Sequence, residues 1–447
     1  MIVTHGVRRA PSVPRRFSTG GQGHLFRGLP APAAAAIDFN PRGFIPSDVC
    51  LVERVSRDGV QNARRNETGS TVIETYSINI ADERLDDLQQ RLARARWPEP
   101  EVVDDWSQGV PAGWLREMCE YWAEAYDWRA REHALNRFDH FRTPIDGIDV
   151  HFIHQRSPVE SARPLLITHG WPGSVVEFHK VIEPLCDPER YGGDPADAFH
   201  IVCPSLPGFG FSGKPTEPGW GVERIARAWA VLMSQLGYDR YLAQGGDWGS
   251  AVTQSIGWQD PDHCAGIHVT LAMGTRPTPS DPPTPAEQRA LDGLAYYQAW
   301  DSGYSKEQST RPQTIGYALT DSPIGQAAWI LEKFWAWTDS DGDPLNVLGR
   351  DELLDNVMVY WLTETAASSA RIYWESFGSI EQQPITVPTG VSVYPREIVQ
   401  PVRKWMEAGD YRNIQYFAEM DKGGHFAAFE QPEAYVGDVR AWARTVA

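Results

Sequence analysis

Cysteine is scarce in this sequence, and its spacing shows no pairing. Among 447 residues there are five cysteines, and none belongs to a C-x-x-C pair: Cys50, Cys119, Cys186, Cys203 and Cys264. An odd number of scattered cysteines argues against a disulfide framework and against a zinc knuckle. A reducing compartment therefore fits this chain best.

Long apolar runs are missing as well. No stretch approaches the roughly 20 apolar residues that a membrane-spanning helix needs, and the most apolar early segment, residues 29–37, is broken by Pro30 and Pro32. The chain carries 59 acidic and 41 basic residues, a net charge of −18. A surface of that charge repels phosphate backbones. We predict a soluble, cytoplasmic protein with no integral membrane segment and no nucleic-acid partner.

Acidic residues are absent before Asp38, whereas that stretch holds five arginines. Residues 1–70 are rich in Gly, Pro and Ala and lack apolar periodicity, so we expect a disordered extension or upstream sequence carried by a misplaced start. The same composition is typical of an organelle targeting peptide, but Pro11 and Pro14 disfavour the amphipathic helix of such a peptide.

After residue 70 the patterns of secondary structure are strong. Alternation predicts a strand over 71–80, and apolar spacing predicts helices over 82–96 and 111–126 and a hairpin over 138–155 that turns at Asp146-Gly147. From Pro164 short apolar strands (165–168, 199–203, 241–243, 265–269) alternate with helices (175–185, 222–236, 251–259). Such alternation is typical of a mostly parallel sheet covered on both faces.

The alternation stops near residue 274 and returns later. A helical, aromatic-rich block follows, then strands over 386–394 and 413–419 and a closing helix over 432–446. We therefore predict an α/β fold with a small N-terminal domain (71–150), a core in two parts (151–274 and 367–447) and a helical cap inserted between them (275–366).

The serine-nucleophile pattern G-x-S-x-G is also absent. In its place, Gly245-Gly-Asp-Trp-Gly249 stands between a predicted strand and a predicted helix. A nucleophile elbow needs small residues two positions before and two after the nucleophile, because the turn is tight. Asp247 is thus a candidate nucleophile. The alternative is an Asp that caps the following helix.

Two further segments strengthen the first interpretation. His169-Gly-Trp-Pro-Gly173 follows a strand where α/β-hydrolases place one oxyanion-hole N–H, which would be that of Trp171, and Trp248 would supply the other. His425 follows the last strand, where the base of that fold lies. The acid should follow the strand ending at Tyr394, which favours Glu397 over Asp410 and Asp421.

Three other motifs are rejected. Gly208-Phe-Gly-Phe-Ser-Gly213 resembles a dinucleotide fingerprint, but prolines occupy the place where the phosphate-binding helix should begin. Asp339-Ser-Asp-Gly-Asp343 resembles a calcium loop, but Pro344 stands where Gly is required, so we expect a solvated turn. His151 and His154 would lie on opposite faces of a strand. We predict no cofactor and no metal.

At this point the chain resembles the microsomal-type epoxide hydrolases, which include the juvenile hormone epoxide hydrolases. The resemblance runs from about Ser77 to the C-terminus and rests on HGWPGS, GGDWG, DSPIGQAAWILEKFWAWTD and GGHFAAFEQPE. It implies an α/β-hydrolase fold whose first domain is the epoxide hydrolase N-terminal domain. It further implies Asp247 as nucleophile, His425 as base and Glu397 as acid, with Tyr304 and Tyr373 of the cap binding the epoxide oxygen.

The expected substrates are a small apolar epoxide and water, and the sequence leaves a homodimer open. Two other functions are kept as alternatives. A haloalkane dehalogenase also uses an Asp elbow, but needs N–H donors for its halide. A catalytically inactive hydrolase fold could act as a binding protein, although the residues of the triad are all present.

Overall fold

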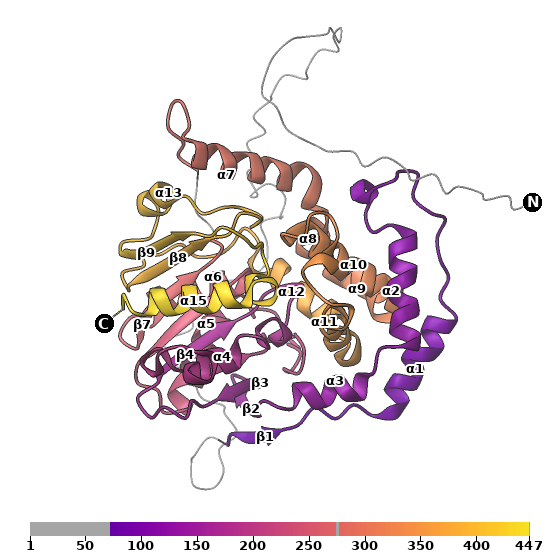
Figure 1. Ribbon diagram of the computed structural model, residues 1–447, viewed down its shortest axis with the longest axis horizontal. Coiled ribbons are helices and arrows are strands. Elements are labelled where there is room, and N and C mark those ends of the chain that lie inside the picture. Colours follow the sequence, from indigo (N-terminus) through magenta and orange to yellow (C-terminus); the bar gives the residue numbers. More distant parts are fainter. Residues whose placement is uncertain (1–71, 274–276, 447) are drawn as a thin grey trace, which may run out of the picture. The chain divides into compact units, whose positions relative to one another are not determined.

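The computed structural model describes residues 72–273 and 277–446, so the predicted extension over 1–70 lies outside the described residues. Nine strands form one sheet in the order β1-β2-β3-β5-β4-β6-β7-β8-β9 (Figure 1). The strands are β1 (Glu74–Tyr76), β2 (His140–Ile145), β3 (Ile148–Gln155), β4 (Arg163–Thr168), β5 (Phe199–Pro204), β6 (Tyr241–Gly245), β7 (Cys264–Val269), β8 (Thr389–Val393) and β9 (Ile414–Glu419).

Strands β4 to β9 pair in parallel, whereas β1, β2 and β3 join them through antiparallel pairing. The mostly parallel sheet of an α/β-hydrolase fold is therefore confirmed. Each parallel strand is followed by a segment that returns over a face of the sheet, which is why these strands are apolar nearly throughout. Their carboxyl ends lie at one edge, where catalytic loops of such sheets gather.

Alternate residues of one strand serve two different cores. In β4, Leu165 and Ile167 belong to the cluster that includes helices α4 (Ile182–Cys186) and α15 (Pro432–Ala443). Leu166 between them belongs to the larger cluster with α5 (Val222–Gln235) and α6 (Trp248–Gln259). The sheet is thus covered on both faces, as the continuous apolar strands predicted.

A helical block lies between β7 and β8, which are neighbours in the sheet (Figure 1). Its helices are α7 (Pro285–Tyr296), the π-helix η5 (Tyr297–Asp301), α8 (Gly303–Thr310), α9 (Pro312–Asp321), α10 (Pro323–Trp337), the 3₁₀ turn η6 (Pro344–Asn346), α11 (Arg350–Thr363) and α12 (Ala366–Ser376). Helix α12 packs against α8 and α9. The predicted boundary after residue 366 therefore separates α12 from the helices that it contacts.

The segment before β2 connects the sheet with the inserted helices. It contains α1 (Asp82–Ala93), the 3₁₀ turn η1 (Trp106–Gln108), α2 (Ala112–Glu124) and α3 (Trp128–Leu135). Arg131 of α3 donates to both carboxylate oxygens of Asp355 in α11, and Tyr121 of α2 donates to Asp351. Residue 150, the last residue of the predicted N-terminal domain, lies within strand β3. The predicted boundary therefore falls inside a strand of the sheet.

Two predicted elements are wrong in extent. The helix expected over 175–185 is instead a 3₁₀ turn, η2 (Val175–Phe178), followed by α4. A helix through both would place Pro184 in its interior, where proline lacks the N–H and clashes with the preceding turn. The strand expected over 71–80 shrinks to β1 because the N–H groups of Ile78 and Ile80 bind the side chains of Asn136 and Glu132.

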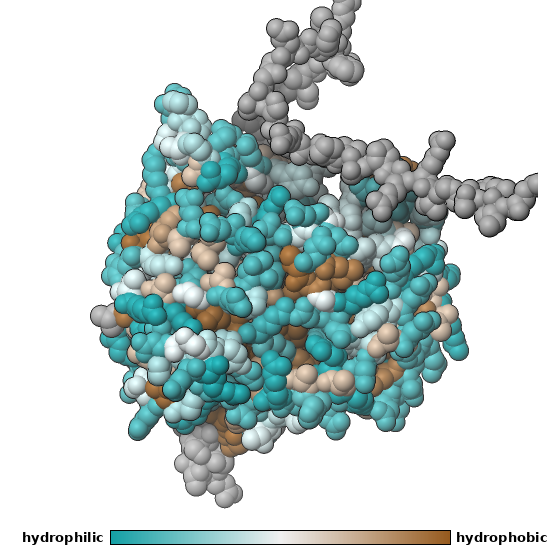
Figure 2. All heavy atoms as spheres, in the orientation of Figure 1, coloured by the Kyte–Doolittle hydropathy of each residue, from teal (hydrophilic) through white to brown (hydrophobic). Residues whose placement is uncertain are grey.

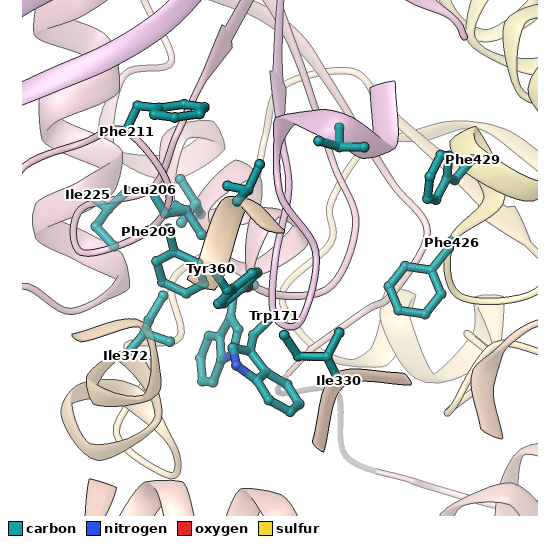
Figure 3. Close-up of a cluster of buried hydrophobic side chains, with 14 of the residues drawn as sticks. Trp171, Leu206, Phe209, Phe211, Ile225, Ile330, Tyr360, Ile372, Phe426 and Phe429 are labelled. Atoms are coloured by element: carbon teal, nitrogen blue, oxygen red, sulfur yellow. The ribbon is translucent and has the colours of Figure 1, made fainter. Parts of the chain in front are cut away.

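The remaining elements are short: η3 (Pro188–Tyr191), η4 (Pro195–Asp197), α13 (Arg403–Ala408) and α14 (Ala427–Glu430). The larger hydrophobic cluster joins the sheet to the inserted block, since Ile330 of α10 and Ile372 of α12 belong to the same cluster as Trp171 (Figure 3). On the face that Figure 2 shows, hydrophilic residues predominate and hydrophobic ones gather in small patches. The inserted helices and the sheet therefore share one apolar core.

Candidate active site

The turn between β6 and α6 carries Asp247 in a strained backbone conformation. Its φ of 49° and ψ of −129° lie outside the regions that non-glycine residues favour. A Cβ at Gly245 would lie 2.1 Å from the carbonyl oxygen of Gly249, and a Cβ at Gly249 would lie 1.9 Å from that of Thr168. The small residues that the elbow pattern required are therefore needed for steric reasons, and α6 begins directly after Asp247.

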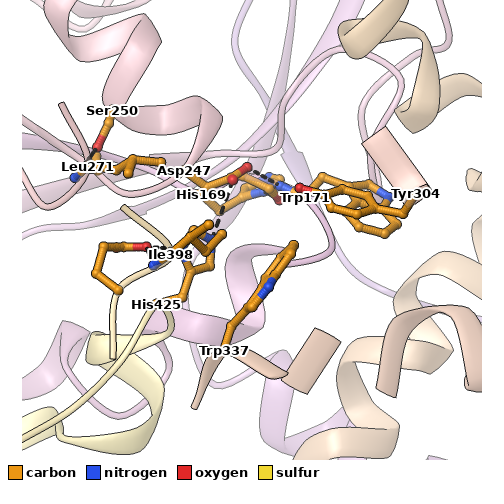
Figure 4. A network of polar contacts seen from close by, with 12 residues as sticks. His169, Trp171, Asp247, Ser250, Leu271, Tyr304, Trp337, Ile398 and His425 are labelled. Carbon is orange, nitrogen blue, oxygen red and sulfur yellow. Dashed lines mark hydrogen bonds and ion pairs between the residues drawn. The ribbon is translucent and has the colours of Figure 1, made fainter. Parts of the chain in front are cut away.

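The Asp247 carboxylate does not cap the helix that follows it. No hydrogen bond from its side chain caps α6. Its Oδ1 accepts instead from the backbone N–H of Trp171 at 2.8 Å, and the side chain is buried (Figure 4). A Cβ at Gly170 would lie 2.1 Å from the same oxygen. The chain before Trp171 thus approaches the carboxylate too closely for any larger residue, and Trp248 follows as the first residue of α6.

His425 lies between two carboxylates. Its Nδ1 is 2.6 Å from Glu397 Oε1, and its Nε2 is 3.4 Å from Asp247 Oδ2. Burial lowers the pKa of His425, but the charges of Glu397 and Asp247 outweigh burial and raise it well above its ordinary value. The imidazole is therefore held with its Nδ1–H toward Glu397 and its Nε2 toward Asp247. Glu397 follows β8, as expected.

The two predicted tyrosines come from separate helices and meet above the elbow. The hydroxyls of Tyr304 (α8) and Tyr373 (α12) are 3.4 Å apart, close enough for both to reach one small acceptor. The Tyr304 ring stacks on Trp171 with centroids 4.9 Å apart, and the Tyr373 ring meets Trp248 edge to face at 4.8 Å. The two hydroxyls are thus held beside the elbow by the residues that flank it.

Burial also affects the chemistry of these hydroxyls. It raises the pKa of both Tyr304 and Tyr373 well above the ordinary value, with further contributions from the neighbouring tyrosines and Asp247. Both groups are consequently neutral O–H donors across the physiological pH range. An acceptor that gains negative charge beside such buried donors receives strong stabilisation from them.

Two family models match the chain: "Epoxide hydrolase N terminus" over residues 73–178 and "alpha/beta hydrolase fold" over residues 163–326. A protein of Stigmatella aurantiaca (strain DW4/3-1) named "Putative epoxide hydrolase" is 52% identical over 82% of this chain and 84% of its own. The chain belongs to the epoxide hydrolase family. Epoxide hydrolase 1 of Sus scrofa is 36% identical over 82% of this chain and 88% of its own. The solved epoxide hydrolase of Aspergillus niger matches with a TM-score of 0.76 and 34% identity, over 85% of this chain and 97% of its own.

Several groups support the loop that carries His425, a role that their motifs did not indicate. The loop before His425 is held by backbone donors: Gly423 N–H donates to Asp339, Gly424 N–H to Glu430, and His425 N–H to the carbonyl of Trp337. The segment predicted as a solvated turn thus holds this loop through Asp339. Burial raises the pKa of Glu430 to about 7.

Two more groups were missed near the tyrosines and the Trp171 loop. The Tyr297 hydroxyl lies 3.5 Å from that of Tyr304 and donates to Ser305. Glu177 is buried against Gly173, and burial raises its pKa to about 8. Sequence spacing could not identify either residue. Tyr297 of η5 approaches Tyr304, and Glu177 of η2 approaches Gly173, only because of how these two short helices pack.

Among residues 72–273 and 277–446, no group of three or more His, Cys, Asp or Glu side chains could hold a metal ion. His151 bonds to His140 and Ser205, while His154 bonds to Tyr238. Within the same ranges no helix has both the length and the apolar character to cross a membrane. The cytoplasmic location, the homodimer and the division into domains stay predictions.

Proposed function

We propose that this epoxide hydrolase opens apolar epoxides through a covalent ester on Asp247. A carboxylate is ionised at neutral pH and can attack a ring carbon directly, so it needs no base in this step. Tyr304 and Tyr373 would hydrogen-bond the ring oxygen and supply the proton that the opened alkoxide needs. The meeting of the two hydroxyls beside the buried carboxylate is the observation that carries the proposal.

The second step hydrolyses this ester. His425 would remove a proton from water, which then attacks the carbonyl carbon of the esterified Asp247, while Glu397 keeps the imidazole in the required tautomer. The oxygen that becomes an oxyanion belongs to Asp247 itself. The N–H of Trp171 already donates to one of its oxygens, and Trp248 N–H would be the second donor. One such donor is typically worth about 3 kcal/mol of barrier.

The charge on His425 supports this order of events. Before reaction the imidazole faces two carboxylates, a situation that favours its protonated form. Once Asp247 becomes a neutral ester, one of these charges disappears and the protonated form loses stability. Its proton would then pass to the phenolate that ring opening leaves, so His425 would become a base only after the first step, when a base is needed.

An apolar epoxide is the substrate class that the surroundings favour. The rings of Trp171, Trp248 and Trp337 surround Asp247, His425 and the tyrosine pair, and all three indoles are buried. Such walls stabilise apolar substituents through contact area. They offer no charged group to a polar substituent on the substrate.

A single turnover in heavy-oxygen water, with enzyme in excess over styrene oxide, tests the covalent mechanism. Label should enter the Asp247 carboxylate first, because water attacks the ester carbonyl, and the first diol should carry none. Label in the first diol would contradict the covalent step. Halide release from haloalkanes without diol formation would favour a dehalogenase, and no turnover on a broad panel of epoxides would favour a binding protein.

Two variants separate the two steps. His425→Ala should accumulate the ester, visible as an added substrate mass on the intact protein, whereas Asp247→Ala should show no adduct.

Replacing Tyr304 and Tyr373 together with Phe should slow ester formation by at least about 10²-fold, since both proton donors are lost. Each single Phe variant should lose less, because the remaining hydroxyl reaches the same oxygen. Full activity in the double variant would exclude the tyrosines.

A further inference from the structure

A buried lysine lies behind the tyrosine pair and has no part in the chemistry described so far. Lys333 of α10 is only 5% exposed. Its ammonium pairs with Asp301 and with Glu332, both at 2.7 Å. Lysine is among the residues least often found fully buried, and then it is paired. The desolvation of this charge calls for an explanation beyond packing.

The ammonium faces the rings of two residues beside the elbow. Lys333 Nζ lies 4.7 Å from the ring centroid of Tyr304 and 5.3 Å from that of Trp337. Asp301 connects Lys333 with Trp337. Its Oδ1 accepts from the Lys333 ammonium, and its Oδ2 accepts from the Trp337 indole N–H at 2.6 Å. Trp337 in turn contacts both Tyr304 and His425 (Figure 4). Within this arrangement the cation is directed at the aromatic ring of a proposed proton donor.

We propose that Lys333 is a positioning residue that stabilises the negative charge developing on Tyr304 while this phenol gives its proton to the epoxide oxygen. The inference rests on the proposed function. A cation over an aromatic ring is attracted by its electron-rich face. The attraction grows as the O–H bond breaks, because electron density then moves into the ring. The interaction is thus stronger in the transition state than in the ground state, as catalysis requires.

The balance of the step is simple. The bond from the ring carbon to the ring oxygen breaks, the Asp247 oxygen bonds to that carbon, and the alkoxide takes the proton of Tyr304. The phenolate left behind accepts a hydrogen bond from Tyr373 and lies beside the Lys333 cation. The imidazolium of His425 then loses its proton, which restores the phenol of Tyr304, and His425 takes a new proton from the water that attacks the ester.

Other charges around this phenol act in the opposite direction. Burial of the site and the charge of Asp247 disfavour a phenolate at Tyr304. The carboxylates of Asp301 and Glu332, both paired with Lys333, carry two negative charges against the one positive charge of this lysine. A competing explanation follows: Lys333 could serve only to neutralise Asp301, which positions Trp337. The experiment must therefore remove the cation without leaving Asp301 unpaired.

The double variant Lys333→Met/Asp301→Asn meets that need. It removes the charges of Lys333 and Asp301, while the amide oxygen of the introduced asparagine still accepts the Trp337 N–H. Glu332 also loses its partner Lys333, so the same double change is compared in a Glu332→Gln background. We expect single-turnover ester formation about 10-fold slower, with hydrolysis of the formed ester unchanged. In a Tyr304→Phe background the same double change should have no further effect. Lys333→Arg, which keeps the cation, should recover most of the rate.

Asp301→Asn alone provides a second measurement if the double variant does not fold. It keeps the cation, so ester formation should proceed at the wild-type rate or faster. Lys180→Met is a matched control, because Lys180 also lies over an aromatic ring, that of Phe429 at 5.0 Å, and pairs with Glu352. Its loss should leave ester formation unchanged.

A wild-type rate of ester formation in the double variant would overturn the inference, and so would an equal loss when Tyr304 is already Phe. Slowing in Asp301→Asn as large as in the double variant would likewise assign the effect to Asp301. If the wild-type protein forms no ester at all, the proposed function fails instead, so the two failures are distinguishable.

Discussion

The protonation of His425 should depend on the charge of Asp247, and Asp247→Asn tests this dependence. The two side chains are 3.4 Å apart, from Nε2 to Oδ2. At an effective dielectric constant of about 20, opposite unit charges at that distance attract by about 5 kcal/mol. Asparagine keeps the size of the side chain and an oxygen for the Trp171 N–H, but it removes the charge. It therefore imitates the neutral ester.

The pKa of His425 is raised well above its ordinary value in the wild-type protein, despite burial, because Glu397 and Asp247 favour the imidazolium. In Asp247→Asn we expect this pKa to fall markedly, so that the proton leaves at lower pH. The stability linked to this proton is fully present below about pH 6.5, the unfolded value, and is lost as pH rises through the folded pKa. In the variant that loss should come at lower pH.

Proton–carbon NMR of histidine-labelled protein measures this titration directly, with His425→Gln to assign the signal. Denaturant unfolding across the same pH range measures the linked stability. Asp260→Asn is the control: Asp260 lies 2.6 Å from His263 and raises the pKa of that histidine, so this variant should shift His263 and leave His425 unchanged. If the pKa of His425 is the same in the wild-type protein and in Asp247→Asn, then ester formation does not turn His425 into a base, and the reasoning is refuted.

Two further predictions concern a steric contact at Gly170 and the buried ion pair between Arg131 and Asp355. Gly170→Ala should reduce ester formation by at least about 10²-fold while the protein stays folded, because its Cβ would lie 2.1 Å from Asp247 Oδ1. Gly437→Ala is the control, since nothing lies within 4 Å of a Cβ at that position. Equal single-turnover rates in the two variants would contradict the steric argument. Arg131→Met should lower the free energy of unfolding by about 3 kcal/mol in denaturant titrations, because Asp355, buried in α11, keeps the hydrogen bond from Tyr126 but loses its cationic partner. An unchanged midpoint would show that this ion pair contributes nothing.

The helix boundaries show where local patterns are sufficient. Helix α5 begins and ends within a residue of its predicted range, since its apolar stripe and its flanking glycines act locally. The predicted helix over 175–185 failed because apolar spacing does not register the effect of Pro184 on a longer helix. The predicted strand over 71–80 failed because its N–H groups find the side chains of Asn136 and Glu132, and such distant partners leave no local signal.

The candidate site divides in the same way. The glycines around Asp247 could be recognised because a tight turn imposes short-range steric demands, and Glu397 could be placed by counting from its strand. Tyr304 and Tyr373 followed only from the family resemblance. No periodicity connects α8 with α12, and the 3.4 Å between the two hydroxyls results from how these helices pack.

By itself the sequence determined the α/β pattern, the elbow with Asp247 at its centre, and the order in which the elbow, the acid and His425 follow one another. Steric demands and apolar periodicity act within a few residues, so they are legible along the chain. Only the tertiary structure decided that the hydroxyls of Tyr304 and Tyr373 lie 3.4 Å apart and that the cation of Lys333 faces the ring of Tyr304. These contacts join residues far apart in the chain, and their free energy depends on burial and distance, which arise only when the elements pack together.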